Sequence, residues 1–272
     1  MTKRYLKSGA SLVAAFVLVV ASVLWGAPEA LGQDSGDLSK WSESSSRKAG
    51  TRQTLKVGET EYGFVWIPKG DFDMWDRGAR PRVKLTKGFW MLETETTQAL
   101  YKAIMSENPS AFNDGDNLPV ENVSWNDAMK FCAELTKRLP AGLKASLPTE
   151  AQWEYACRAG TKTEYSYGNS SDGNKMNYGT SGTKAVKSYD SNPWGLYDMH
   201  GNVCEWCLDY YGDYPTSAVV DPKGPDSASY RVHRGGSWDD WYESICRSAD
   251  RYWNVADYRD SDLGFRVLLS CD

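Results

Sequence analysis

The sequence predicts an α+β domain with few helices, many short strands and long loops. Only three stretches place apolar residues at helical spacing behind a capping residue. Two others, Glu61 to Pro68 and Arg82 to Trp90, have the apolar character of strands, and the first of them ends at a proline. Beyond Gly160 the chain is rich in Gly, Ser, Asn, Asp and aromatic residues, and little of it has a regular period. That composition is typical of short strands joined by long loops.

The three helices are predicted from their first turns. Thr97 to Met105 has apolar residues on one face. Ser124 and Asp127 form the start of a capping box, and apolar residues follow them at helical spacing: Ala128, Phe131, Cys132 and Leu135. The third helix begins at Thr149, with Gln152 as its capping partner. We expect these helices to pack their apolar faces against the strands.

The first 32 residues have the features of a secretory signal peptide. A positive start is followed by an apolar run and then by a cleavage site of small residues; these are Lys3, Arg4 and Lys7, then Leu12 to Trp25, then Ala30 to Gly32. The run is short for a bilayer span, which needs about 20 residues. We therefore expect a secreted, periplasmic or cell-envelope protein. Contact with a membrane is expected only if this segment stays uncleaved.

The rest of the chain divides into a linker and one domain. Residues 33–54 are polar and lack an apolar period, which predicts a flexible linker. Residues 55–272 are long enough for one domain with a sizeable core. The 272-residue chain has a net charge of −5, which argues against nucleic acid as a partner.

The segment from Asn192 to Tyr211 contains a candidate calcium site. Its oxygen donors are the carboxylates of Asp198 and Glu205 and the backbone carbonyls of Gly201 and Val203. A chain that turns at the glycine and then extends can direct these oxygens to one point, and Ca²⁺ prefers such a mixed cage of hard oxygens. The alternative is a Gly-Asn turn in which the carboxylates cap backbone N–H groups.

The same segment resembles a family signature. The pattern G-L-Y-D-M-x-G-N-V-x-E-W is similar to that of the formylglycine-generating enzymes, also called sulfatase-modifying factors. Further blocks of this family occur in the expected order: FVWIP, LTKGFW, LPVENVSW, LPTEAQWEYACRAG, RGGSW and LGFRV. The resemblance covers about Leu55 to Leu269 and implies the C-type-lectin-like variant of the α+β class.

The resemblance implies one calcium site and argues against a second. Asp198, Gly201, Val203 and Glu205 match the family's calcium ligands. A second family site would lie near Asn177, but the following loop, GTSGTKAV, lacks its acidic ligand. We therefore expect one structural calcium ion.

The six cysteines of an exported chain predict disulfides, for which fifteen complete pairings exist. The resemblance implies a bond between Cys157 and Cys246, and less directly one between Cys132 and Cys271. Two cysteines remain, Cys204 and Cys207. They form a redox C-x-x-C pair, a structural bridge, or two thiols that face separate partners.

The family's oxidase chemistry is not expected in its usual form. Formylglycine-generating enzymes hold Cu(I) with two cysteines that closely follow the GGS motif, and oxygen ligands do not replace thiolates on Cu(I). Here the segment reads SWDDWYESIC, with Asp240 at the position of the first catalytic cysteine. No residue from Trp238 to Ile245 is a cysteine, and Cys246 matches a structural position of the family. Copper is therefore not an expected cofactor.

Other enzyme classes find little support. The sulfoxide-synthesising branch of the family needs a cluster of histidines for iron, and this chain has only His200 and His233. Either of them is a possible base for a serine or cysteine hydrolase, but no spacing favours that reaction. The neighbouring carboxylates Asp239 and Asp240 would point to opposite faces of an extended segment.

The segment that replaces the catalytic cysteines predicts a binding surface. Ser237, Trp238, Asp240 and Trp241 lie where the resemblance places the family's substrate groove, and aromatic side chains offer a large contact area at low entropic cost. We expect at least two of Trp238, Trp241 and Trp253 to line this groove. In contrast, we expect three other tryptophans in the core: Trp153, Trp194 and Trp206.

These observations favour a secreted binding or accessory module that is stabilised by calcium and binds a polypeptide or a glycan. The alternatives are an active formylglycine-generating oxidoreductase that uses unusual thiols, or another enzyme on the same scaffold.

Overall fold

The computed structural model describes residues 38–44, 46–74 and 80–271. The predicted signal peptide lies outside this range, as does the start of the predicted linker. Within the described part of the chain, none of the helices has the length and apolar character that a membrane span requires.

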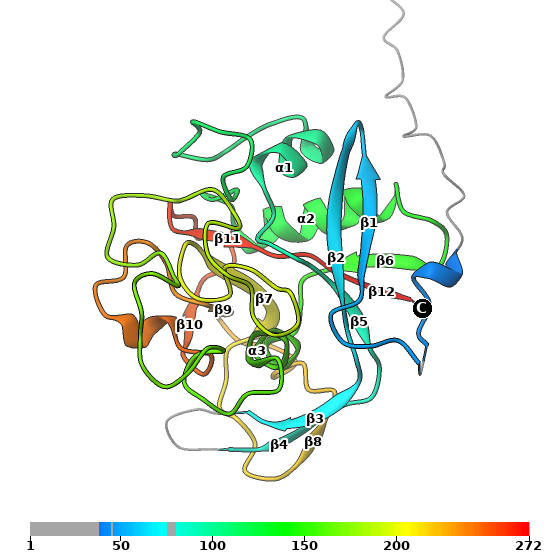
Figure 1. Ribbon diagram of the computed structural model, residues 1–272, viewed down its shortest axis with the longest axis vertical. Helices are drawn as coiled ribbons and strands as arrows, with labels where there is room; N and C mark the ends of the chain where they lie inside the picture. The colour runs from blue at the N-terminus through cyan, green and yellow to red at the C-terminus, as the bar shows by residue number, and fades with distance from the viewer. Residues whose placement is uncertain (1–37, 45, 75–79, 272) are drawn as a thin grey trace, which may run out of the picture. The chain divides into compact units, whose positions relative to one another are not determined.

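The strands form three sheets (Figure 1). The five-stranded sheet has the order β1 (Arg52–Val57), β2 (Thr60–Ile67), β5 (Phe89–Leu92), β12 (Leu268–Cys271) and β6 (Leu143–Ser146). The four-stranded sheet has the order β10 (Arg251–Asn254), β9 (Arg231–Arg234), β7 (Cys204–Tyr210) and β11 (Leu263–Phe265). The third sheet contains β3 (Gly70–Asp73), β4 (Arg82–Leu85) and β8 (Val219–Val220). Only two strand pairs among the described residues are parallel, β11 with β7 and β4 with β8.

All three predicted helices are confirmed, together with their caps. They are α1 (Gln98–Met105), α2 (Trp125–Thr136) and α3 (Glu150–Arg158). Thr97 accepts a hydrogen bond from the backbone N–H of Leu100, and Ser124 and Asp127 form a reciprocal capping box. In α3 the same exchange joins Thr149 and Gln152. The helix α2 packs against α1 and β6 (Figure 1). The structure thus has the predicted α+β class.

The predicted strand from Arg82 to Trp90 is in fact two strands, β4 and β5, with a break between them. Gly88 lies in that break, and a Cβ atom there would come within 2.3 Å of the Trp66 ring. The chain therefore turns at the one residue that lets this indole pack closely.

Part of the predicted linker is packed against the domain. Residues 38–40 form a short 3₁₀ turn, and Trp41 after it is only 5% exposed. The indole of Trp90 donates a hydrogen bond to the Trp41 carbonyl oxygen at 2.8 Å, and the Trp41 ring meets Phe64 edge-on. The guanidinium of Arg47 also lies over the Trp90 ring, and β1 begins at Arg52, inside the predicted linker. These isolated contacts bind the segment to the core, although they create no period in the sequence.

The strand β7 separates the two main hydrophobic clusters of the described residues. Cys204 and Trp206 belong to the cluster that includes α1 and α2, whereas Cys207 belongs to the cluster around Trp153 of α3. Trp153 and Trp206 are fully buried, as expected, and Trp194 is only half-buried against the second cluster. The segment that the sequence singles out therefore runs through the middle of the molecule's core.

Candidate functional site

Glu205 of β7 is the centre of a buried network. Its Oε1 accepts a hydrogen bond from Arg266 Nη2 at 2.7 Å, and its Oε2 accepts one from the Trp153 indole at 2.7 Å. Arg266 Nε lies 3.1 Å from both oxygens. All three side chains are almost fully buried, and nearby charges raise the pKa of Arg266 above its ordinary value. The carboxylate is therefore held in one orientation by a bidentate ion pair.

Two further carboxylates lie close enough to Glu205 to interact with it. Glu95 accepts hydrogen bonds from the Val203 backbone N–H at 3.1 Å and from the Asn202 side chain at 3.0 Å. Burial and the charges of Asp198 and Glu205 raise the pKa of Glu95 well above its usual range. Burial likewise raises the pKa of Asp198 to about 6. We call Glu95, Asp198 and Glu205 the carboxylate cluster.

The carboxylate cluster fits a cation by charge, and one observation argues against it. Three buried carboxylates surround one arginine, so the interior carries excess negative charge that a hard divalent ion would neutralise. Asp198 and Gly201 adopt positive φ angles of 55° and 77°, as the predicted turn requires. However, both oxygens of Glu205 already accept N–H hydrogen bonds. Among the described residues, no three Asp, Glu, His or Cys side chains converge as metal ligands, although a cage of two carboxylates and two carbonyls does not need three.

The loop of the family's second calcium site is closed by its own hydrogen bonds. The Asn177 side chain donates to the Gly182 carbonyl oxygen at 3.0 Å and to Asn202 Oδ1 at 3.1 Å. It also accepts a hydrogen bond from the Thr180 hydroxyl at 2.9 Å. This asparagine is therefore satisfied without a cation.

The structure contains no bond between Cys157 and Cys246, in contrast to the disulfide that the resemblance implies. None of the six cysteines, each of which lies within the described residues, is joined to another by a disulfide. Cys157 packs with Trp153, and Cys246 packs in a separate small cluster. Burial raises the pKa of Cys157 to about 12 and also raises that of Cys246, so neither thiol is a nucleophile at neutral pH. Cys204 and Cys207 face separate clusters, one of the three predicted arrangements.

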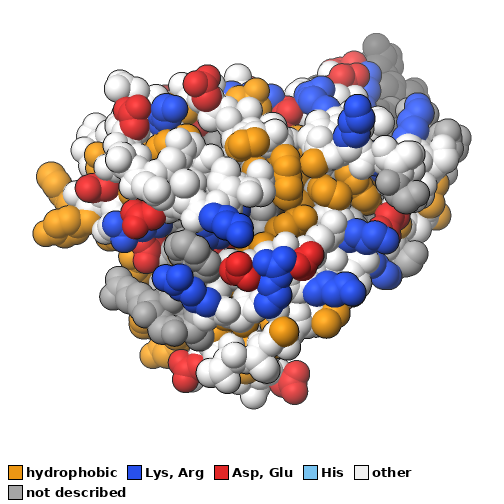
Figure 2. Space-filling model, turned by 60° about the horizontal axis from the view of Figure 1, so that its bottom comes forward, with side chains coloured by type: hydrophobic (Ala, Val, Ile, Leu, Met, Phe, Trp, Pro, Cys, Tyr) orange, Lys and Arg blue, Asp and Glu red, His pale blue; other side chains and the backbone are white. Residues whose placement is uncertain are grey.

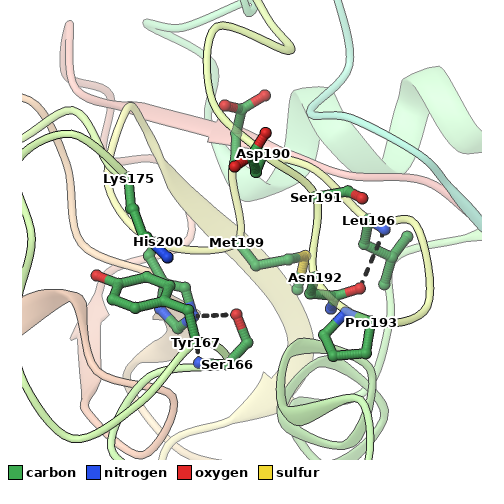
Figure 3. A pocket seen from close by; sticks show the side chains of 11 residues that line it. Ser166, Tyr167, Lys175, Asp190, Ser191, Asn192, Pro193, Leu196, Met199 and His200 are labelled. Carbon is green, nitrogen blue, oxygen red and sulfur yellow. Dashed lines mark hydrogen bonds between the residues drawn. The ribbon is translucent and has the colours of Figure 1, made fainter.

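A pocket of about 280 Å³ lies beside His200 (Figure 3), and Asp198 is one of its lining residues. His200 Nε2 lies 3.0 Å from the Ser166 backbone nitrogen and 3.1 Å from its hydroxyl, while Nδ1 lies 2.7 Å from the Cys246 carbonyl oxygen. These contacts assign the proton to Nδ1. Burial lowers the pKa of His200 to about 4. The ring is thus a neutral structural group and a weak base, which does not favour a hydrolase.

Two of the four predicted ligand-binding residues have structural roles. Ser237 is fully buried, and its backbone N–H donates to Asp240 Oδ2 at 2.7 Å. Its hydroxyl lies 3.1 Å from the same oxygen and 3.0 Å from Asp262 Oδ2. Asp240, at the position of the family's first catalytic cysteine, therefore closes a turn, and its side chain is directed inward. Its pKa is raised, chiefly by burial.

The aromatic neighbours of that turn differ in exposure. Trp238 is half-buried, with its indole hydrogen-bonded to the Ser261 carbonyl oxygen at 3.1 Å and its ring edge-on to Phe112. Trp241 is 81% exposed and Tyr242 is 71% exposed. Because tryptophan is seldom left in water at such a level, this exposure marks a candidate contact surface.

Two more exposed aromatic residues follow in the same part of the chain. Trp253 is 44% exposed, and its ring lies 4.2 Å from that of Tyr211; Tyr258 is 38% exposed. We call Trp241, Tyr242, Trp253 and Tyr258 the exposed aromatic set. On another view of the surface, Figure 2 shows charged side chains of both signs interspersed with hydrophobic ones, so that face carries no field of a single sign.

Sequence reasoning missed Glu95, Arg266 and Asp262. Arg266 stands between Phe265 and Val267 in an apolar stretch, which was a usable signal, because a buried arginine needs a carboxylate. Glu95 gave no such signal, since it meets Asn202 and Val203 from more than a hundred residues away along the chain.

The fold and the buried network together define an α+β domain of the formylglycine-generating type. A family profile described as the sulfatase-modifying factor enzyme 1-like domain matches residues 48–271. The chain belongs to this family.

Relatives and a solved structure agree with the assignment. The chain is 41% identical over 153 residues to a serine/threonine-protein kinase pkn1 of Chlamydia caviae, a match to 54% of this chain and 23% of that protein. It is 36% identical to the formylglycine-generating enzyme of Mus musculus, over 55% of this chain and 44% of the enzyme. It is 35% identical to the inactive C-alpha-formylglycine-generating enzyme 2 of Mus musculus, over 56% of this chain and 49% of that protein. The chain thus spans a quarter to a half of the length of these relatives.

Among solved structures, Treponema denticola variable protein 1 is similar over 81% of this chain and 99% of its own, with 31% identity and a TM-score of 0.75.

Proposed function

We propose that the chain is a binding module that retains the family fold without formylglycine-generating chemistry. One observation carries the proposal: Asp240, at the position of the first thiolate, is locked into a turn by Ser237, and the next residue, Trp241, is 81% exposed. A relative named as inactive supports it, as does the variable protein of Treponema denticola, which the chain covers almost completely. The expected ligand is a polypeptide.

The exposed aromatic set supports a polypeptide partner in particular. Exposed tryptophan and tyrosine side chains are the residue types that dominate protein interfaces. Asp239 and Asp257 are also exposed in this part of the chain, so the surface offers carboxylates to cationic groups of a ligand. A glycan, which also stacks on aromatic rings, is the other possible outcome of the test below.

The binding proposal is tested by panning a displayed random peptide library on the wild-type chain and then measuring the affinity of the selected peptides for the double variant Trp241→Ala/Tyr242→Ala. Selected peptides should bind the wild type, and the double variant should lose about 1–3 kcal/mol of binding free energy. Phe112→Leu, beside the half-buried Trp238, serves as a control outside the exposed set. If selected peptides bind the double variant equally, or if only a glycan array gives signals that depend on Trp241, the polypeptide proposal fails.

The second candidate, an active oxidoreductase, is tested separately. A cysteine-containing sulfatase peptide is incubated with the protein and copper, and its mass is measured. We expect no conversion of cysteine to formylglycine, because the buried thiols have raised pKa values and Asp240 offers no soft ligand. Conversion would overturn the proposed loss of oxidase activity.

We further propose that one Ca²⁺ binds Asp198, Glu205 and the carbonyls of Gly201 and Val203. The support is the excess negative charge of the carboxylate cluster. Calcium at a hundredfold excess over its dissociation constant should stabilise the protein by about 3 kcal/mol, seen as a rise in melting temperature. Asp198→Asn should reduce this rise, whereas Asp226→Asn, at an exposed position, should not. If adding calcium to the metal-free protein leaves its melting temperature unchanged, the proposed calcium site is wrong.

Export through the N-terminal segment remains part of the proposal. Mature protein recovered outside the cytoplasm is expected to begin near Gln33, which N-terminal sequencing would check.

A further inference from the structure

A second cavity, separate from the exposed aromatic set, lies beside the first turn of α3. Its volume is about 370 Å³, a size typical of small-molecule sites. It is enclosed by the end of β7, the strands β4 and β8, and the loop over residues 212–225. Much of its wall is apolar and comes from these side chains: Met74, Val83, Pro215, Val219, Pro222 and Pro225.

The cavity has a buried carboxylate in its wall. Asp209, near the end of β7, is only 3% exposed. Its Oδ2 accepts a hydrogen bond from the Glu150 backbone N–H at 2.9 Å, which caps the first turn of α3. It forms no ion pair with any residue that the structure describes. The helix terminus offsets part of its charge, and burial still raises the pKa of Asp209 to about 7.

The positive charge of Arg251, in the same wall, opposes the rise in the pKa of Asp209 but does not cancel it. Arg251 is engaged by Glu150 through two hydrogen bonds of 2.8 and 2.7 Å, and Tyr214 donates to the same glutamate at 2.8 Å. The remaining charged lining residues, Asp213 and Lys223, are exposed and of opposite sign. The cavity thus combines an apolar wall with one carboxylate, Asp209, that forms no ion pair with a described residue.

We propose that this cavity binds a primary ammonium group on a short apolar stem, with the ammonium at Asp209 and the stem against the proline-rich wall. An ammonium donates to carboxylate oxygen in a charge-assisted hydrogen bond, which is strong where water is excluded. The stem gains by leaving water for the prolines and valines. The source of this chemistry is either a free alkylamine or the side chain of a lysine residue in a polypeptide.

Isothermal titration of the full-length protein with n-pentylamine, 1-pentanol and Nα-acetyl-lysine methylamide tests the proposal. At least one of the two ammonium compounds should bind, and 1-pentanol should bind about tenfold or more weakly, because it lacks the charge. Binding of n-pentylamine assigns the site to free amines, and binding of the lysine derivative alone assigns it to polypeptide lysine. If neither ammonium compound binds at up to about 50 mM, or if pentanol binds as well as the amines, the proposal is overturned.

Variants locate the site. Asp209→Asn keeps an acceptor for the Glu150 N–H and removes the charge, so it should weaken ammonium binding about tenfold or more. Asp213→Asn removes a charge of the same sign from the exposed rim and should change binding less than about twofold. Val219→Phe fills the cavity and provides a second test if Asp209→Asn does not fold. Unchanged binding in Asp209→Asn or, where that variant is unfolded, in Val219→Phe would overturn the proposal.

The proposed ammonium site and the proposed polypeptide-binding surface can be tested independently of each other. Trp241→Ala should leave ammonium binding unchanged, because this residue does not line the cavity.

Discussion

The network around Glu205 and the turn at Ser237 lie in two of the family's motifs, but the network is buried whereas the turn leads into exposed residues. Around Glu205 each carboxylate oxygen has a donor, and Arg266 and Trp153 are fully buried. At the turn, Asp240 is tied to Ser237, yet Trp241 beside it extends into solvent. The difference shows that buried ion pairs specify the framework, whereas the residues displayed after the turn contribute little to it. Such a division allows the surface to change while the fold is kept.

The largest effect should come from breaking the buried network. Arg266→Met removes the cation that pairs with Glu205 in the interior, so the free energy of unfolding should fall by about 3–5 kcal/mol, measured by urea denaturation. Arg82→Met breaks contacts with Asp71 and Asp73 that are about half exposed, so the free energy of unfolding should fall much less than in Arg266→Met. Equal losses of unfolding free energy in both variants would contradict the distinction between buried and exposed ion pairs.

A smaller effect, which depends on pH, should come from His200. Burial lowers its pKa from 6.5 to about 4 in the folded protein. Between these values the unfolded chain binds a proton that the folded chain does not, so this histidine lowers stability as pH falls. The destabilisation caused by His200→Gln should therefore shrink by about 2 kcal/mol between pH 7 and pH 5. A destabilisation that does not vary with pH would show that His200 is not held neutral.

The smallest effect on stability should come from the exposed residues that follow the turn at Ser237. Trp241→Ala should change the free energy of unfolding by less than about 0.5 kcal/mol, because the side chain is 81% exposed. In contrast, Trp206→Ala, at a fully buried position, should cost about 3–5 kcal/mol. If Trp241→Ala lost several kcal/mol, the residue would belong to the framework.

Features governed by local sequence were predicted, and features governed by distant contacts were not. The caps at Thr97, Ser124 and Thr149 are local hydrogen bonds, so the sequence located all three helices. The turn at Gly201 was predicted from its glycine and its motif. Glu95 was missed because its partners are far away in the chain.

The roles of single surface and interior side chains were harder to predict. Ser237 and Asp240 were expected to face a ligand, but the short turn between them lets their own groups pair. Trp41 was expected in a linker, since one docked aromatic residue leaves no period to detect. In each case one packing or hydrogen-bonding partner decided the outcome, and a residue pattern does not report such a partner.

The single hydrogen of the Ser237 hydroxyl limits the number of hydrogen bonds that this turn can form. The hydroxyl lies within hydrogen-bond distance of both Asp240 and Asp262. One of the two contacts is therefore a hydrogen bond only when a carboxyl group supplies the second hydrogen. Burial raises the pKa of Asp262 to about 6, so mild acidity provides it. At the position where the resemblance places a metal-binding thiolate, this chain joins two carboxyl groups through one serine hydroxyl.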